Sequence, residues 1–226
     1  MSDLKMVNRV IETRTYTYAE LSEMFGTRDN QGIKRRLENM GIIFNMKGRG
    51  GGTTFEIQAI TDPFKAFCIL ELGFDSRTDF RKLRNFLFYF FYDENFNWKP
   101  HEAMEEYLRR EGNAVSRQTI TGYLNRLERN DLLNLHGETV YYKVFTENDK
   151  QKHELISKEE YSAAWMIYWE EKEKGTDPQT AFSIMKSVLG GIPKKHYRPI
   201  PNAFTLDTYN KLVEYVTDSM LAEDGK

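Results

Sequence analysis

The chain has 226 residues, of which 40% are hydrophobic and 14% aromatic, and its formal net charge is -2. A chain of this length and apolar content can bury one large or two small cores, which argues against disorder of the whole chain. The near-neutral charge excludes a protein that is cationic all over, so any contact with nucleic acid must depend on locally concentrated charge.

Cys68 is the only cysteine and lies in the apolar run AFCIL. No intramolecular disulfide can form, and we expect the thiol to be part of a core. The N-terminal residues show no apolar segment of the signal-peptide type, and the chain has no run of about 18 apolar residues. We therefore expect a cytoplasmic protein with no membrane partner.

The first recognisable motif in residues 12–60 is a capping box at residues 17–20. In TYAE, the Thr17 hydroxyl and the Glu20 carboxylate can satisfy free backbone N–H groups, so a helix should begin at Tyr18. Gly26 suits a left-handed helix end, and the helix should stop there.

A second helix should run from Asp29 or Asn30 to about Met40, because Ile33 and Leu37 recur at i and i+4 on one face. The polar side chains of this helix then point outward. The strings IIFNM, KGRGGG and TTFEIQAI follow, and they predict strand, flexible basic turn and strand.

Residues 61–97 predict a helical connector that is dense in aromatic residues, with the central string FRKLRNFLFYFFY. Apolar side chains cover most sides of this helix, which favours burial in a core over the alternative of a stacking platform for single-stranded bases. Three arginines at helical spacing form a basic stripe that either meets phosphates or is simply solvated: Arg77, Arg81 and Arg84.

The order of elements then repeats in residues 98–147. LERNDLL matches LENMGII at an offset of 90 residues. Pro100 opens a helix, and Ser116 caps the next one, RQTITGYLNRLERN. LLNLHGETVYYKVF predicts a hairpin with its turn near His136 to Glu138.

Two short helices followed by a hairpin resemble the winged helix-turn-helix family, here in two copies. The resemblance implies an α+β fold, mainly α with small β-hairpin wings. We divide the chain into a first winged-helix module, a helical connector, a second winged-helix module and a helical C-terminal region, at residues 1–60, 61–97, 98–147 and 148–226.

In that family the second helix lies in the major groove of DNA and the wing touches the backbone or the minor groove. The resemblance therefore implies DNA contacts from the first helix pair, its wing and the second helix pair. These residues are Arg28, Asn30, Gln31, Lys34 and Arg35, then Lys47 and Arg49, then Arg117, Gln118, Thr121 and Asn125.

Local charge separates the two copies. Residues 27–50 hold six cations against two acids, whereas residues 101–150 hold seven cations against nine acids. Glu138 also stands in the second predicted wing where the first has Arg49. The first module is thus the stronger candidate for DNA, and the second binds either DNA or protein.

The C-terminal region predicts three helices, of which the first opens with a capping box at Ser157 and Glu160. Its stripe of Tyr161, Trp165 and Tyr168 indicates either a core or a dimer surface. The string IPKKHYRPIP lies between the last two helices, as a basic arm along a DNA backbone or a stiff connector. Its candidate contacts are Lys194, Lys195 and Arg198.

Signatures of chemistry are lacking in the sequence. The four histidines are scattered, GRGGG lacks the Lys-Ser/Thr ending of a phosphate-binding loop, and no nucleophile has a base beside it. We expect no enzyme, no cofactor and no metal.

The resemblance favours a sequence-specific double-stranded DNA-binding protein acting as a transcriptional regulator. The alternatives are a plasmid or phage replication or partition initiator, and a protein-interaction module that binds a nucleic-acid enzyme, with a homodimer or protein partner held by the C-terminal helices.

Overall fold

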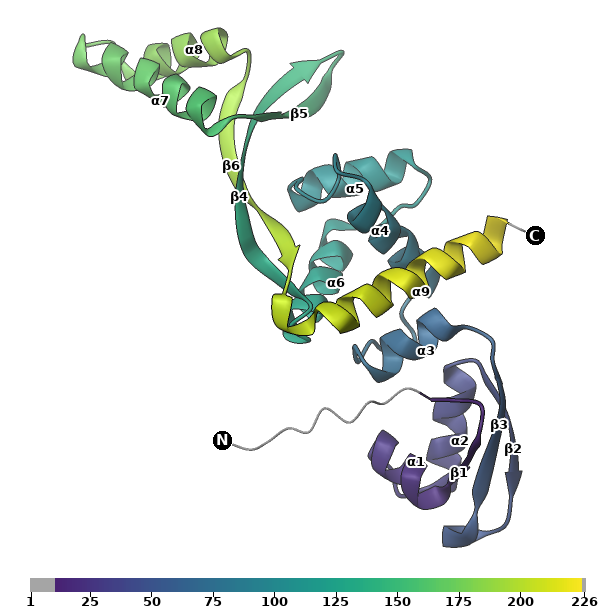
Figure 1. The fold of residues 1–226 in the computed structure, drawn as a ribbon. Coiled ribbons are helices and arrows are strands. Elements are labelled where there is room, and N and C mark those ends of the chain that lie inside the picture. Colours follow the sequence, from purple (N-terminus) through teal and green to yellow (C-terminus); the bar gives the residue numbers. More distant parts are fainter. Residues whose placement is uncertain (1–10, 225–226) are drawn as a thin grey trace, which may run out of the picture. The chain divides into compact units, whose positions relative to one another are not determined.

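The computed structural model describes residues 11–224. Helices dominate, and the strands form two small antiparallel sheets of three strands each (Figure 1). The chain divides into two units. Unit 1 contains the residues up to Phe88 and the segment from Leu206 onward, and unit 2 contains Tyr89–Thr205. The expected α+β class is confirmed at this level.

Unit 1 begins with the elements that its sequence predicts, preceded by one short strand. In chain order these elements are β1 (Thr15–Thr17), α1 (Tyr18–Phe25), α2 (Asn30–Asn39), β2 (Ile42–Lys47), a 3₁₀ turn (Gly50–Gly52) and β3 (Thr54–Ile60). The sheet order is β1-β3-β2, so the strand before the helix pair adds to the outer edge of the hairpin.

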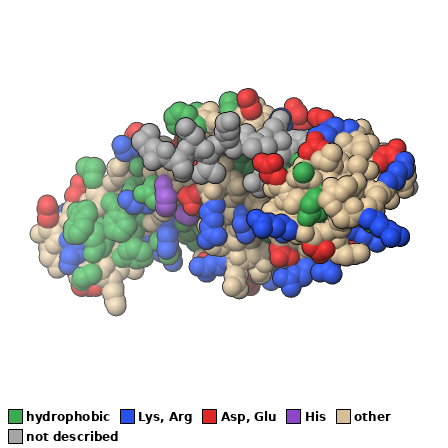
Figure 2. Space-filling model, turned by 90° about the horizontal axis from the view of Figure 1, so that it is seen from below, with side chains coloured by type: hydrophobic (Ala, Val, Ile, Leu, Met, Phe, Trp, Pro, Cys, Tyr) green, Lys and Arg blue, Asp and Glu red, His purple; other side chains and the backbone are tan. Residues whose placement is uncertain are grey.

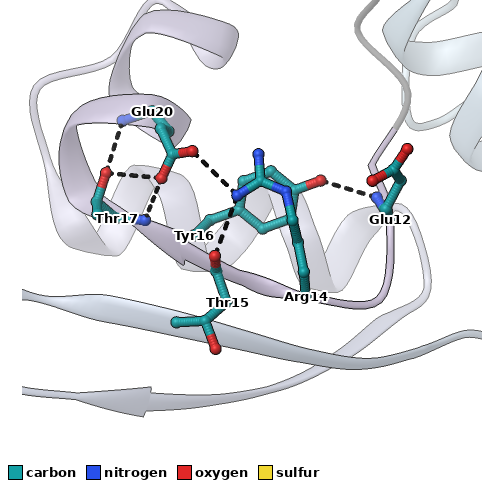
Figure 3. A network of polar contacts seen from close by, with 6 residues as sticks. All are labelled: Glu12, Arg14, Thr15, Tyr16, Thr17 and Glu20. Carbon is teal, nitrogen blue, oxygen red and sulfur yellow. Dashed lines mark hydrogen bonds and ion pairs between the residues drawn. The ribbon is translucent and has the colours of Figure 1, made fainter.

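The start of α1 is fixed by the predicted capping box, which is drawn in Figure 3. The Thr17 hydroxyl accepts a hydrogen bond from the Glu20 amide at 3.3 Å, and the Glu20 carboxylate accepts one from the Thr17 amide at 2.7 Å. Arg14 adds an ion pair to Glu20 at 3.0 Å while its guanidinium stacks on the Tyr16 ring, 3.7 Å from the centroid. The hydrogen bonds from Thr17 lower the pKa of Glu20 from its ordinary value of 4.5 to about 2.

We expect unit 1 to lose stability on acidification through this carboxylate. Because the pKa of Glu20 is lowered in the folded state, its contribution is complete above pH 4.5 and disappears as the pH falls toward about 2. Glu20→Gln should therefore flatten the fall of the unfolding free energy in this window, measured by urea denaturation at a series of pH values. Glu23→Gln, on the same helix, should follow the wild type. Equal curves for all three proteins would contradict the role of Glu20.

The core of unit 1 lies between the helix pair and the sheet. Ile33 and Leu37 of α2 and Leu21 of α1 are fully buried, as their helical spacing predicts. Phe55 of the central strand β3 is also fully buried, and its ring centroid lies 5.9 Å from that of Phe44. This packing holds α2 against the sheet by one face and leaves the other face to solvent.

Two further helices complete unit 1, namely α3 (Pro63–Leu70) and α9 (Leu206–Asp224). They pack against each other through Phe67 and Tyr215, whose ring centroids are 5.0 Å apart. Cys68 on α3 is fully buried and burial raises its pKa, so the expectation of a core thiol is confirmed.

The aromatic helix is α4 (Phe80–Tyr92), which begins in unit 1 and ends in unit 2. Phe80, Leu83, Phe86, Leu87 and Phe90 are buried, so the prediction of a core helix is confirmed. A base-stacking platform would require these rings to be exposed.

Unit 2 contains a helix pair, a three-stranded sheet and a helical hairpin. The elements are α5 (His101–Arg110), α6 (Arg117–Arg129), β4 (Leu133–Glu147), β5 (Lys150–Ile156), α7 (Lys158–Glu173), α8 (Pro178–Leu189) and β6 (Ile192–Pro201). β4 is central, between β5 and β6. Trp98, Val140, Tyr142 and Val144 form a buried cluster on this sheet.

The hairpin predicted within LLNLHGETVYYKVF is wrong. These residues form one long strand, β4, with an irregularity between Asn134 and Glu138. The actual turn follows Glu147, where Asn148 and Asp149 adopt φ angles of 51° and 58°. Two left-handed residues in a two-residue loop are typical of a hairpin turn that matches strand twist.

The predicted helical C-terminal region also needs correction, because residues 148–226 include β5 and β6. The string IPKKHYRPIP forms β6, which pairs with β4 from Leu133 to Val144. β6 is an edge strand, where prolines are tolerated because one side of the strand needs no N–H donors.

α7 and α8 form an antiparallel helical hairpin between the end of β5 and the start of β6 (Figure 1). Only Ala164 of α7 is buried, while Met166 and Trp169 are 61% and 60% exposed. Figure 2 shows hydrophobic side chains gathered on the surface that this hairpin contributes. The predicted stripe of Tyr161, Trp165 and Tyr168 is half-buried, so α7 is neither a core helix nor an ordinary solvated one.

Across residues 11–224, no helix combines the length and the apolar character that crossing a membrane requires.

Candidate nucleic-acid interface

Three exposed polar side chains lie on the outward face of α2 or just before it. Arg28, just before the helix, and Gln31 and Arg35 on it are exposed. Their side chains make no hydrogen bond or ion pair with any residue in the described part of the chain. Guanidinium and amide groups presented by one helix face can form bidentate hydrogen bonds with base edges.

Lys34 lies on the side of α2 that faces β2. Its Nζ atom is 3.8 Å from a carboxylate oxygen of Glu38, which is a loose pair at one helical turn. Together with Ile43 and Met46, which are 50% and 46% exposed, it borders a shallow groove of about 430 Å³. Lys34 therefore lies at the edge of the exposed face of α2, on the side next to β2.

The glycine-rich turn between β2 and β3 has a defined conformation. Gly48 has a φ of 89°, and a Cβ atom there would lie 2.6 Å from the Gly52 carbonyl oxygen. Gly50 also has a positive φ, of 56°. Only glycine adopts such angles without cost, so these residues are needed for the turn itself.

This turn is tied to the start of α2. The Asn30 amide donates to the Gly50 carbonyl at 3.3 Å and to the Thr53 hydroxyl at 3.1 Å. Thr53 is buried, donates its hydroxyl hydrogen to Gly50 at 2.8 Å, and accepts a hydrogen bond from the Tyr18 amide at its carbonyl, at 2.9 Å. These bonds fix the hairpin tip against both helices. The nitrogen of Asn30, a predicted DNA contact, is thereby engaged within the protein.

The two cations predicted on the wing differ in their surroundings. Lys47 forms an exposed ion pair with Glu56 across the hairpin at 3.4 Å. Arg49 is exposed, and the described residues offer it no ion-pair or hydrogen-bond partner. Since the Gly50 carbonyl accepts a hydrogen bond from Asn30, the backbone next to Arg49 lies close to the start of α2.

The second helix pair presents its polar residues less freely. Arg117 pairs with Glu102 of α5, and its backbone N–H donates to Glu105 at 3.1 Å. Thr121 contacts the His101 ring through its hydroxyl at 2.9 Å. Two of the four predicted contacts are thus engaged by α5.

Gln118 and Asn125 keep their side chains free of hydrogen bonds to other described residues. Gln118 is exposed and Asn125 is half-buried. Neither of these two side chains carries a charge.

The remaining predicted phosphate contacts have three kinds of surroundings. Arg84 is buried, with 8% of its surface exposed, so the predicted stripe of Arg77, Arg81 and Arg84 does not lie on one exposed face. Arg77 pairs with Asp75, and Arg198 pairs with Glu138. Arg81 is exposed, as are Lys194 and Lys195 on β6.

Sequence reasoning missed two features of the molecule. Thr53 carries no signal in the sequence that it fixes the wing, since its role depends on contacts across the fold. Two of the four histidines lie close together in unit 2, with the His101 and His196 ring centroids 6.4 Å apart. Burial lowers the pKa of both. Within residues 11–224 no group of three or more His, Cys, Asp or Glu is arranged to hold a metal ion.

Comparison with known proteins adds no relative: no protein-family model, no curated protein and no solved structure matches this chain.

Proposed function

We propose that this chain is a sequence-specific double-stranded DNA-binding protein that acts as a transcriptional regulator and reads DNA with α2 and the β2–β3 wing. The observation that carries the proposal is the pair of hydrogen bonds from the Asn30 side chain to Gly50 and Thr53, which hold the wing tip close to the start of α2. The sheet order β1-β3-β2 behind a helix pair also suits a winged helix.

The charges on α2 and the wing fit the two parts of a DNA duplex. Gln31 and Arg35 project from the exposed face of α2, the element that a major groove accommodates. Arg49 and Lys47 are on the wing, where cations meet phosphates without regard to sequence. Arg28, just before α2, adds a further exposed cation.

Unit 2 has a smaller part in this proposal. Glu102 and Glu105 hold the start of α6, and a helix whose arginine is paired with an acid must break that pair before it can meet a base. We assign reading to unit 1 alone. The exposed Lys194 and Lys195 of β6 remain candidate backbone contacts.

Fluorescence anisotropy with a labelled duplex tests the proposal. We expect the affinity to fall steeply between about 50 and 200 mM salt. Each neutralised phosphate contributes about -0.9 to the slope of the logarithm of the binding constant against the logarithm of the salt concentration. A duplex that stays unbound at low salt would refute the proposal. A replication or partition initiator would bind DNA in the same way, and binding to a replication origin in place of a promoter would distinguish it.

The α7–α8 hairpin favours a second candidate function, that of a protein-interaction module. Its surface exposes Met166, Trp169 and Val188, each by more than half. Exposed apolar patches of this kind commonly mark interaction sites. Either a second copy of the chain or a nucleic-acid enzyme would cover it.

Trp169→Ser distinguishes these occupants. If the hairpin forms a homodimer, light scattering should give a dimer for the wild type and a monomer for the variant, with unchanged circular dichroism. Ser162→Ala, at an exposed position of the same helix, is the matched control and should remain dimeric. A monomeric wild type would eliminate the homodimer.

A further inference from the structure

Unit 2 contains a polar groove that the proposed DNA contacts do not use. It has a volume of about 500 Å³ and lies between α5 and the β4–β5 turn. Lys99, Glu102, Glu106 and Arg110 line the helical side, and residues 149–153 line the other side. Ligand sites typically have volumes of about 300–1,000 Å³.

Lys99 is a partly buried cation at the side of this groove. It is half-buried, and its Nζ atom lies 4.6 Å from the centroid of the Trp98 ring. No carboxylate of the described residues forms an ion pair with it. Burial lowers its pKa, and the charge of the nearby Asp93 carboxylate acts in the opposite direction.

The Trp98 ring under Lys99 is part of a packed aromatic group. Trp98 is 2% exposed and packs on Tyr142 with ring centroids 5.8 Å apart. Tyr142 in turn lies 5.8 Å from the ring of His153, which borders the groove. The ammonium group therefore lies over a buried, packed aromatic cluster.

The other charges of the groove divide into paired and unpaired groups. Arg110 donates two hydrogen bonds to Glu106, at 3.0 and 2.8 Å, and Glu102 is held by Arg117. Lys150 is exposed and has no ion-pair partner among the described residues. A negative ligand would find Lys99 and Lys150 available, whereas the acids keep lone pairs that can accept hydrogen bonds from hydroxyl groups.

We propose that this groove binds a small phosphorylated molecule that also carries hydroxyl groups, such as a sugar phosphate. The phosphate would meet Lys99 and Lys150, and the hydroxyls would donate to Glu102 or Glu106. Lys152 of β5 also lines the groove, but it is already loosely paired with Glu147, at 3.8 Å. A nucleic-acid backbone fits less well, because Glu102, Glu106 and Asp149 would repel a continuous polyanion.

Calorimetric titration of the full chain tests this proposal with three probes: ribose 5-phosphate, ribose and inorganic phosphate. We expect saturable binding of ribose 5-phosphate, at least about ten-fold tighter than of either part alone, since hydrogen bonds to charged groups are the strong ones. Lys99→Met should weaken this binding about ten-fold or more. Lys186→Met, at an exposed position of α8, is the matched control and should bind as the wild type does.

Three outcomes would overturn the proposal: no heat from ribose 5-phosphate at millimolar concentration, equal binding of ribose 5-phosphate by Lys99→Met, or a loss of duplex-DNA affinity as the only effect of Lys99→Met. Lys150→Gln serves as a second variant if Lys99→Met does not fold. The duplex anisotropy of Lys99→Met separates the two proposals, because loss of the sugar phosphate with retained DNA affinity affects this groove alone.

Discussion

Replacing Phe55 with alanine should lower the free energy of unfolding of unit 1 by about 3–5 kcal/mol, the range for emptying a large aromatic site in a core. Phe55 is fully buried near the start of β3, the strand that lies between β1 and β2. Its loss would leave a cavity beside Phe44 and beneath the helix pair.

Denaturation followed by two signals locates this effect. All three tryptophans, Trp98, Trp165 and Trp169, belong to unit 2, so their fluorescence reports on that unit, whereas circular dichroism reports on both. We expect the dichroism transition to move to lower denaturant and the fluorescence transition to move less. Phe204→Ala, at a position 95% exposed, is the control. A shift no larger than that of the control would contradict the assigned core.

Arg35→Ala should weaken binding to the preferred duplex by about 1–3 kcal/mol, the cost of losing a bidentate contact with a base. Arg35 is exposed on α2, and no partner in the described chain must be released before it meets DNA. The effect should be largest for the preferred sequence and small for unrelated duplexes. Competition anisotropy with both kinds of duplex measures this difference.

Arg36→Ala provides a control of identical chemistry on the same helix. Arg36 leans toward α1, with its guanidinium carbon 6.0 Å from the centroid of the Phe25 ring. The Arg36→Ala variant should therefore bind every duplex with nearly the affinity of the wild type. Equal losses from both variants would indicate that α2 contributes only general positive charge, and an unchanged Arg35→Ala would remove α2 from the interface.

Local signals predicted the first half of unit 1 well. The capping box at Thr17 and Glu20, the left-handed Gly26 and the pair of Ile33 and Leu37 each act within a few residues, and each is present. Such motifs depend on backbone groups close in the chain, so the sequence contains all their parts. β1 was missed, since three residues give no detectable period.

Unit 2 shows why long-range pairing escapes this reasoning. Gly137 was interpreted as part of a turn, but a Cβ atom there would lie 2.3 Å from Ile200 Cγ1. The glycine allows β6 to approach an irregular part of β4, and glycine within a strand often marks this situation. The partner strand lies some sixty residues farther along the chain, and nothing near Gly137 indicates it.

The sequence predicted which side chains point away from the core at the candidate site. It did not predict which of them are already bonded to a neighbouring element. The helical period placed Gln31 and Arg35 outward, and both are exposed. It also placed Arg117 and Thr121 outward, but Glu102 and His101 of the preceding helix occupy them. Periodicity within one helix cannot show which groups a neighbouring helix brings against it.

Selection of bound duplexes from a random pool, carried out in parallel with the wild type and Arg35→Ala, tests the central claim most directly. The claim is that α2 and the wing of unit 1 read a DNA sequence. Our account predicts enrichment of one short motif by the wild type, with relaxed preference at a definite position for the variant. A pool that remains random with the wild type, at a salt concentration where the protein is folded, would contradict it.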